Sequence, residues 1–256
     1  MIDTAIEAAR EAGEYLRQSV GRVRSIETKQ GEDRNLVSEI DKTSERMIID
    51  AIRRRFPGHA ILAEESGGSG RGAEYTWIID PLDGTTNFLH GVPIFSVTIG
   101  IEHRGEVIAG VVYDPNLDEL FTAERGAGAF LNGQELHVSS SDQLITSLLV
   151  TGFPYDIASN PNHAVEHFTH FLMAARGIRR LGSAALDLSY VAAGRFDGFW
   201  EVYLKPWDMA AGALLVREAG GTITDFAGRP SSIHCPQVVA SNCRIHSAML
   251  AVLDSV

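Results

Sequence analysis

Two carboxylates three residues apart, Asp80 and Asp83, lie in the segment of this sequence that is best suited to chemistry, residues 77–88. An apolar run leads up to Asp80 and predicts a buried strand that ends there, because Pro81 cannot donate a hydrogen bond to a sheet. The residues at 84–87 can cap and begin a helix. Carboxylate and carbonyl oxygens suit Mg²⁺, and the free amides at the start of a helix suit a phosphate. The segment is therefore predicted to form a site for phosphoryl chemistry.

Repulsion between the two carboxylates sets a requirement on such a site. Two like charges about 4 Å apart repel by about 4 kcal/mol where the effective dielectric constant is about 20. A bound cation or other hydrogen-bond donors must offset this free energy. The alternative interpretation is a surface turn, since Asp-Gly and Asn are common turn residues. The order of the whole segment, from the strand through the two acids to the helix start, favours the site.

Four more acidic residues lie at the ends of predicted elements: Glu64 and Glu65 after a strand at 60–63, Asp41 at the start of a helix at 41–56, and Asp208 at the start of a helix at 207–219. Taken singly, Asp41 and Asp208 are typical helix caps, and the two glutamates are typical solvated strand ends. They share their position at the edge of an element with Asp80 and Asp83. This shared position makes them candidates for the same site.

Hydrophobic periodicity predicts an α+β first half and an α/β second half, with sheets and helices in alternating layers. The first half, 1–142, is predicted to contain an amphipathic N-terminal helix, a helix at 41–56, strands at 60–63, 75–79, 95–102, 106–113 and 119–124, and a hairpin at Asn132-Gly133. The second half, 143–256, is predicted to contain helices at 161–176, 183–193, 207–219 and 243–254 and strands at 145–150, 197–202, 222–225 and 237–241. We expect the halves to form one domain.

Two polar stretches are predicted to be loops. The stretch from Lys29 to Asn35 is predicted to be a mobile loop. The stretch 66–72 is rich in glycine, but it does not end in Gly-Lys-Ser/Thr, and a strand follows it rather than a helix. It is therefore interpreted as a flexible connector and not as a nucleotide-binding loop.

Composition and charge disfavour several classes of protein. Hydrophobic residues make up 45% of the 256 residues and charged residues 21%, as in ordinary globular proteins. The net charge of −11 disfavours nonspecific binding to nucleic acid or to an anionic membrane, since both require positive surface. The acids of the N-terminal helix argue against a signal peptide or a membrane span, and Cys235 and Cys243 form no disulfide framework. We therefore expect a cytoplasmic protein.

Several segments together resemble the inositol monophosphatase family, within the larger group of Mg²⁺-dependent, lithium-sensitive sugar phosphatases. The resemblance runs along almost the whole chain, and 179–221 is especially similar to bacterial members. It is carried by the stretches 63–66, 80–88 and 206–212, and by 36–41 and 182–185. It implies a layered αβαβα sandwich of the type shared with fructose bisphosphatases. It also implies a phosphatase that uses a metal-activated water to hydrolyse a phosphate monoester, with myo-inositol monophosphate as the expected substrate.

The same resemblance implies a role for each residue of the site. The implied metal ligands, for two or three Mg²⁺ ions, are Glu64, Asp80, the carbonyl of Leu82, Asp83 and Asp208. The implied catalytic residues are Thr85, which is held by Asp41 and orients the attacking water, and Glu65, which assists. The implied substrate-binding residues are Gly84, Thr85, Thr86, Gly182, Ser183, Ala184, Glu201 and Asp208. Lys29 matches a mobile lysine that helps to seat a further metal, and Arg179 and Arg180 contact either the substrate or a partner subunit.

The resemblance leaves the substrate open among related chemistries. Related families hydrolyse fructose 1,6-bisphosphate, histidinol phosphate or 3′-phosphoadenosine 5′-phosphate, and Thr86-Asn87-Phe88 favours the inositol type. A fructose-1,6-bisphosphatase or another sugar or nucleotide phosphatase is the alternative. A non-catalytic interaction protein is less favoured, because no ligand is missing and Thr85 is present. The expected partners are a small phosphate ester and a second copy of the chain in a homodimer, without a membrane or direct binding of nucleic acid.

Other catalytic sites fit the sequence poorly. The two aspartates at 80 and 83 are out of register with the Asp-x-Asp-x-Thr motif of phosphatases with an aspartate nucleophile, and no Gly-x-Ser-x-Gly elbow is present. His163, His167 and His170 have a spacing that could bind a metal on one helix face, but they lack the His-Glu-x-x-His pattern. They are interpreted as a polar surface or a subunit contact.

Overall fold

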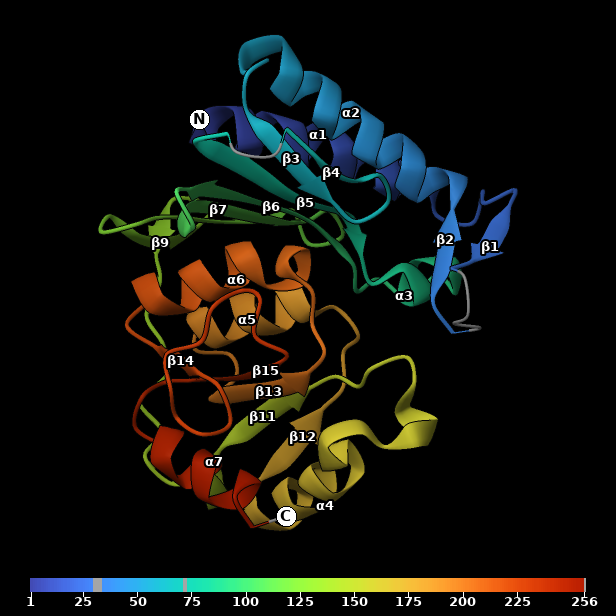
Figure 1. Ribbon diagram of the computed structural model, residues 1–256. Helices are drawn as coiled ribbons and strands as arrows, with labels where there is room; N and C mark the ends of the chain where they lie inside the picture. Colours follow the sequence, from blue (N-terminus) through green and yellow to red (C-terminus); the bar gives the residue numbers. More distant parts are fainter. Residues whose placement is uncertain (30–33, 71–72, 256) are drawn as a thin grey trace.

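The computed structural model describes residues 1–29, 34–70 and 73–255 (Figure 1). The first half contains the helices α1 (Ile2–Ser19), α2 (Glu39–Arg55) and α3 (Thr85–Leu89) and the strands β1 (Ile26–Thr28), β2 (Leu36–Ser38), β3 (Ala60–Ala63), β4 (Gly67–Ser69), β5 (Tyr75–Asp83), β6 (Ser96–His103), β7 (Glu106–Asp114), β8 (Glu119–Glu124), β9 (Gly128–Leu131) and β10 (Gln134–Glu135). The second half contains the strands β11 (Leu148–Thr151), β12 (Gly177–Arg179), β13 (Gly198–Val202), β14 (Thr222–Thr224) and β15 (Gln237–Ser241), the helices α4 (Ala164–Ala174), α5 (Ala184–Ala192), α6 (Pro206–Glu218) and α7 (His246–Leu253), and short 3₁₀ turns at Leu144–Thr146, Ile157–Ser159 and Pro161–His163.

The helices and sheets form alternating layers. Figure 1 shows α1 and α2 on the outer face of the first sheet, α5 and α6 between the two sheets, and α4 and α7 on the outer face of the second sheet. Three apolar clusters fill the spaces between these layers. Because each sheet buries both faces and each helix buries at least one, the layers stabilise one another. This confirms the alternating layers that the sequence pattern predicts and the αβαβα sandwich that the resemblance implies.

The order of the strands brings the ends of β3 and β5 together. Within the described residues, the first sheet has eight strands in the order β10-β9-β8-β7-β6-β5-β3-β4, and the second has five in the order β12-β11-β13-β15-β14. β3 and β5 are parallel neighbours, with Ala63 opposite Ile79. The carboxyl ends of parallel strands meet at one edge of a sheet, so residues that follow the two strands lie close together.

Small residues let α6 lie directly against the first sheet. A Cβ atom on Gly100 of β6 would be 2.6 Å from the Cβ of Ala210, and one on Gly110 of β7 would be 2.8 Å from the Cα of Ala211. No larger side chain fits at these contacts without moving the helix. All residues from Met209 to Val216 are buried, since a helix between two sheets has no solvent face. The position of α6, and of Asp208 in its first turn, is therefore fixed by backbone contact.

The predicted helices and long strands agree with the observed ones to within a few residues, and Leu131 pairs with Gln134 in the predicted hairpin. Four short strands within the described residues were not predicted: β1, β2, β4 and β12. The connector interpretation of 66–72 was wrong for β4, in which Ser69 pairs with Ile61 of β3. A glycine-rich strand of three residues has no hydrophobic alternation that could reveal it. Residues 71–72 of that stretch, and 30–33 of the predicted mobile loop, lie outside the described residues.

Candidate active site

The bend that carries Asp80 and Asp83 is part of β5. The prediction that the strand ends at Asp80 was wrong, because β5 continues to Asp83 through a shift in its pairing with β6. Pro81 lies inside this irregularity, where it interrupts no regular pair of the ladder. The Ser44 hydroxyl of α2 donates to the Pro81 carbonyl at 2.9 Å, and the Leu82 amide donates to Asp80 Oδ1 at 3.0 Å. The bend is thus held from outside by α2 and from inside by its own carboxylate.

Four of the predicted metal-binding carboxylates line one cavity of about 370 Å³: Glu64, Asp80, Asp83 and Asp208. Glu64 follows β3 directly, and its amide donates to the Ile79 carbonyl of β5 at 3.1 Å. Asp208 enters from the other half of the chain, in the first turn of α6, where its carboxylate accepts from the Lys205 amide at 2.7 Å. The structure therefore brings together acids that are up to 144 residues apart in the sequence.

The electrostatics of this cavity favour a bound cation. Burial raises the pKa of Asp80 well above its ordinary value, and the charges of its carboxylate neighbours raise it further. Asp83 and Asp208 keep some surface open to the cavity, yet desolvation raises the pKa of Asp83 to about 6 and that of Asp208 well above its usual range. Oxygen ligands without histidine or cysteine suit Mg²⁺ rather than Zn²⁺. The residues present therefore fit Mg²⁺.

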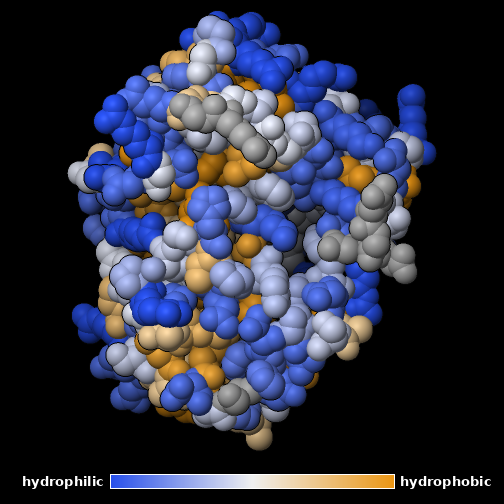
Figure 2. All heavy atoms as spheres, viewed as in Figure 1, coloured by the Kyte–Doolittle hydropathy of each residue, from blue (hydrophilic) through white to orange (hydrophobic). Residues whose placement is uncertain are grey.

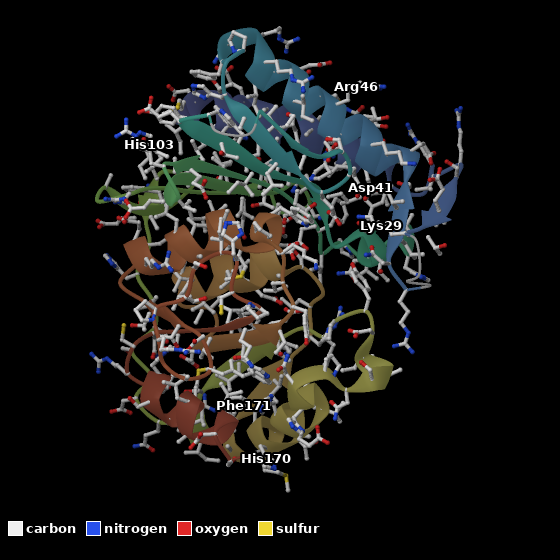
Figure 3. All side chains as sticks on the ribbon, in the orientation of Figure 1. Lys29, Asp41, Arg46, His103, His170 and Phe171 are labelled. Atoms are coloured by element: carbon white, nitrogen blue, oxygen red, sulfur yellow. The ribbon has the colours of Figure 1, made fainter. Side chains whose placement is uncertain are left out.

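The carboxylates stand around the cavity rather than on a single point. Within the described residues, no three His, Cys, Asp or Glu side chains are grouped tightly enough to form a finished metal centre. Lys29 also contacts one of these carboxylates: its Nζ donates to Glu64 at 2.7 Å and to the neighbouring Glu65 at 2.9 Å. Burial by itself lowers the pKa of Lys29, but the two glutamates outweigh it and raise the pKa. Figure 3 shows Lys29 beside Asp41 at the end of the first sheet.

Thr85 and Asp41 form the predicted pair. The Thr85 hydroxyl lies 3.0 Å from Asp41 Oδ1 and 3.1 Å from the Leu82 carbonyl, and its single proton can be donated to either oxygen. The other oxygen of Asp41 accepts from the amide and the hydroxyl of Ser38, at 2.9 and 2.6 Å. Asp41 is therefore both the third residue of an N-terminal capping box and the partner of Thr85. Burial raises the pKa of Asp41, although these hydrogen bonds oppose the shift.

Glu65 lies beside this pair and is held by a residue that the sequence analysis missed. Its amide donates to Glu45 Oε2 of α2 at 2.8 Å, and Glu45 is buried. Burial raises the pKa of Glu65 to about 7, with a further contribution from Glu64 that Lys29 partly offsets. Ser44 and Glu45 follow Asp41 by three and four residues, so they lie on the same face of the helix. Polar residues at this spacing on the inward face of α2 were the sequence signal that could have revealed Glu45.

Hydrogen bonds of Asp83 and Asn87 join the two halves of the chain beside the cavity. Ser183, expected to contact the polyol, donates its hydroxyl to Asp83 Oδ2 at 2.6 Å, and the Ala185 amide donates to the same oxygen at 2.8 Å. The Asn87 amide group donates to the Ile94 and Leu181 carbonyls, each at 2.8 Å. None of these hydrogen bonds was predicted, because backbone groups far away in the sequence supply most of the partners.

Gly84 permits the sharp turn between β5 and α3. Its φ of +94° is left-handed, and a Cβ there would lie 2.9 Å from the Ile94 carbonyl. Thr86 and Gly182 line the cavity close to this turn, as does Ala184 at the start of α5. All the residues predicted to bind the substrate are thus brought to one cavity.

Another part of the cavity wall contains Glu201 and Asp187, both buried, together with the exposed Arg180. Burial raises the pKa of Glu201 to about 8, with Arg180 opposing this shift and Asp83 adding to it. The structure separates the two arginines, since Arg179 lines a different, apolar hollow beside Tyr190. Arg180 therefore lines the cavity of the carboxylates and Arg179 does not.

The histidine cluster lies away from this cavity. Figure 3 shows His170 and Phe171 at the opposite end of the molecule from Lys29 and Asp41. His163 precedes α4 with a left-handed φ of +55°, and His170 Nδ1 lies 3.0 Å from the Ser255 hydroxyl. The polar-surface interpretation was wrong for His167, which is 5% exposed and packs edge-on against Phe226. Burial accordingly lowers the pKa of His167.

Hydrophilic side chains prevail on the face of the molecule that Figure 2 shows. Figure 2 shows hydrophilic residues over most of this face, with a hollow near mid-height on the same side as α3 in Figure 1. Among the described residues there is no helix with the length and apolar composition needed to cross a bilayer.

Known proteins share this chain's sequence and fold along its whole length. The profile of the inositol monophosphatase family matches residues 1–255. The "Nus factor SuhB" of Pseudomonas aeruginosa is 46% identical, over 99% of this chain and 96% of that protein. The "Inositol-1-monophosphatase" of Mesorhizobium japonicum is 41% identical, over 98% and 94%. The crystal structure of extragenic suppressor protein suhB from Bartonella henselae superposes with a TM-score of 0.93 at 41% identity, over 98% of this chain and 97% of that one.

These similarities agree with the geometry of the cavity and with the resemblance of its motifs. The layered α/β fold matches that of solved relatives. The family profile covers all of the residues that the structure describes. The chain belongs to the inositol monophosphatase family.

Proposed function

We propose that the protein is a Mg²⁺-dependent phosphatase that hydrolyses myo-inositol monophosphate to myo-inositol and phosphate. Family membership supports phosphatase activity, and the family is generally metal-dependent. The observation that carries the proposal is the convergence of Glu64, Asp80, Asp83 and Asp208 on one cavity with the Thr85–Asp41 pair at its edge. Such a cavity has ligands for cations, a hydroxyl to position water and open volume for a small ester.

The carboxylates and the Leu82 carbonyl would hold two or three Mg²⁺ ions. When bound, Mg²⁺ would neutralise charge on the phosphate and lower the pKa of the attacking water. The chain's own residues would then orient the reactants. The Gly84 and Thr85 amides would bind phosphate oxygens, and Thr85 would accept a hydrogen bond from the water while it donates its own proton to Asp41. The acidic net charge is no obstacle, since cations and amides, rather than basic side chains, would bind the phosphate. Inhibition by lithium is part of the proposal.

A panel of phosphate esters tests the substrate. We expect turnover of myo-inositol 1-phosphate in Mg²⁺ with kcat/KM at least about tenfold above that for fructose 1,6-bisphosphate, histidinol phosphate and 3′-phosphoadenosine 5′-phosphate. For the two esters that carry a second phosphate, the reason is that the carboxyl groups of Glu201 and Asp187 line the cavity and disfavour a further anionic group. The measurement is release of inorganic phosphate by purified protein. A higher kcat/KM for any of the other three esters would replace the inositol assignment and keep the phosphatase.

Replacement of Thr85 by alanine tests the water-positioning role. We expect kcat to fall by about 10²-fold or more, because the hydroxyl that joins Asp41 to the reaction centre is lost. Mg²⁺ affinity should change little, since the Thr85 side chain is not among the proposed ligands. Thr85→Ser is the matched control, because it keeps the hydroxyl and should keep kcat within about fivefold. Near-normal kcat in the alanine variant, measured at saturating Mg²⁺ and substrate, would refute this role.

A second function follows from the names of the relatives. Identity of 46% to a protein named "Nus factor SuhB" makes such a role a candidate for this chain as well. The expectation that the chain binds no nucleic acid directly conflicts with this candidate and remains a prediction. Complementation of a strain that lacks its own Nus factor SuhB, with wild type and Asp80→Asn side by side, tests the role apart from catalysis.

The homodimer and the cytoplasmic location are also proposals.

A further inference from the structure

Asp187 is a buried acid that the fold does not use. It lies in the first turn of α5 and is 1% exposed, and its Oδ1 has no hydrogen-bond partner among the described residues. A buried polar group without a partner destabilises a protein, so such groups are rare and call for an explanation. An apolar side chain of the same shape would serve the packing of α5 better. The position of Asp187 in the wall of the active-site cavity points to a partner that comes from outside the chain.

The neighbouring side chains leave Asp187 free for such a partner. Arg180 lines the same cavity and its charge favours the ionised form of Asp187, but no hydrogen bond joins the two in the described part of the chain. Arg180 is instead exposed, with Nη1 next to the backbone of Gly182. Glu201 also lines this wall, with its carboxylate against the backbone of Gly152. Two carboxyl groups thus line this wall of the cavity, and Asp187 Oδ1 has no partner among the described residues.

The helix sets Asp187 at a defined place relative to the phosphate end. Ser183 precedes Asp187 by four residues, so the two side chains lie on one face of α5, one turn apart. Ser183 donates to Asp83, which is one of the proposed metal ligands. Gly84, Ser183 and Asp187 line one cavity, so a ligand with its phosphate at the Gly84 turn can reach Asp187 with its other end.

We propose that Asp187 recognises a hydroxyl group of the substrate and is a specificity-determining residue for polyol phosphates. The inference rests on the proposed function, because it takes the phosphate end of the cavity as given. A neutral polyol offers the hydroxyl donors and acceptors that two carboxyl groups can bind, whatever their protonation. Wherever these carboxyl groups are ionised, they would repel a second phosphate or a carboxylate on the substrate. An apolar leaving group would leave Asp187 buried and unpaired.

Two replacements of nearly equal shape separate recognition from packing. Asp187→Leu removes every hydrogen bond, whereas Asp187→Asn keeps a donor and an acceptor in place. We expect kcat/KM for myo-inositol 1-phosphate to fall by about 10–100-fold in the leucine variant and by less than about fivefold in the asparagine variant. The fall for p-nitrophenyl phosphate, which has no hydroxyl to recognise, should be at least about tenfold smaller. The leucine variant should unfold at the same or a higher temperature, since it buries no unpaired polar group.

Binding of myo-inositol itself supplies a readout that does not depend on turnover. Titration calorimetry of the Mg²⁺-loaded protein should detect binding of the polyol to wild type and a loss of about tenfold or more in affinity in Asp187→Leu. Equal losses on both esters, or a fall in thermal stability, would show that Asp187 is structural and overturn the inference. Unchanged kinetics on both esters would overturn it too. If wild type hydrolyses neither ester, the proposed function fails by itself, and the inference then stands or falls with the myo-inositol titration.

Discussion

Asp80→Asn is expected to lower kcat by about 10³-fold or more while raising the free energy of unfolding. Asp80 is 2% exposed and lies among three other carboxylates, so its charge is central to any cation site in the cavity. Asparagine keeps the shape but removes this charge, and a ligand lost at the centre of the site is felt in the transition state. The same change relieves repulsion in the protein without metal, so stability should increase. Phosphate release and chemical denaturation, measured on the same preparation, check both halves of the prediction.

Asp114→Asn is the matched control for this experiment. Asp114 is also a buried acid at the end of a strand, 1% exposed, and burial raises its pKa as well. Its carboxylate accepts hydrogen bonds within the turn after β7, from the Asn116 amide at 2.8 Å, and does not line the cavity. This variant should lose stability and keep kcat within about threefold, the reverse of Asp80→Asn. If Asp80→Asn retained wild-type kcat, or if both variants lost activity in parallel, Asp80 would not be a central ligand.

Removal of divalent cations by EDTA is expected to abolish activity and to make stability fall as the pH rises. In the folded protein burial raises the pKa of Asp83 to about 6 and that of Glu201 to about 8, against values near 4 in an unfolded chain. The folded chain therefore binds more protons than the unfolded chain above about pH 4. The stability that the neutral carboxyls contribute is complete below this pH and is lost as the pH rises through about 6 and 8.

Calorimetry at pH 5 and pH 8 checks this prediction. With EDTA, the Tm at pH 8 should be lower than at pH 5 by roughly 5 °C or more. Excess Mg²⁺ should raise the Tm at pH 8 more than at pH 5, because a bound cation favours ionised ligands and stabilises only the folded state. Addition of Mg²⁺ to the EDTA-treated protein should also restore phosphate release. Full turnover in EDTA, or a Tm that rises with pH in EDTA, would contradict a metal site in this cavity.

The part of the site that belongs to the first sheet could be predicted from the sequence. Glu64 and Asp80 follow apolar runs of strand length, and parallel neighbours bring such residues to one edge. Asp208 could be added only through the resemblance of 206–212 to a known family, because nothing local shows that α6 crosses to the other sheet. The contact from Ser183 to Asp83 spans 100 residues between two polar side chains, and no periodicity encodes it.

The same limits explain the errors in the fold. β4 and β12 have three residues each, which is too short for alternation to be recognised, and both lie at the edge of a sheet. Asp187 has the local pattern of an acid in the first turn of a helix, which usually lies in solvent. Only the packing of α5 between the two sheets shows that it is buried.

Gly100 and Gly110 determine where Asp208 lies, although neither glycine lines the cavity. The clearance between the first sheet and α6 at these glycines is less than one methyl group, so any larger residue there would displace the helix that carries Asp208. A shift of about 1 Å in a reacting group is enough to cost about a hundredfold in rate. Replacement of either glycine by a larger residue is therefore expected to lower phosphatase activity even though every acid of the site is kept. A variant that keeps all of the acids but lacks the glycines would still contain every proposed ligand, with Asp208 displaced from the other carboxylates.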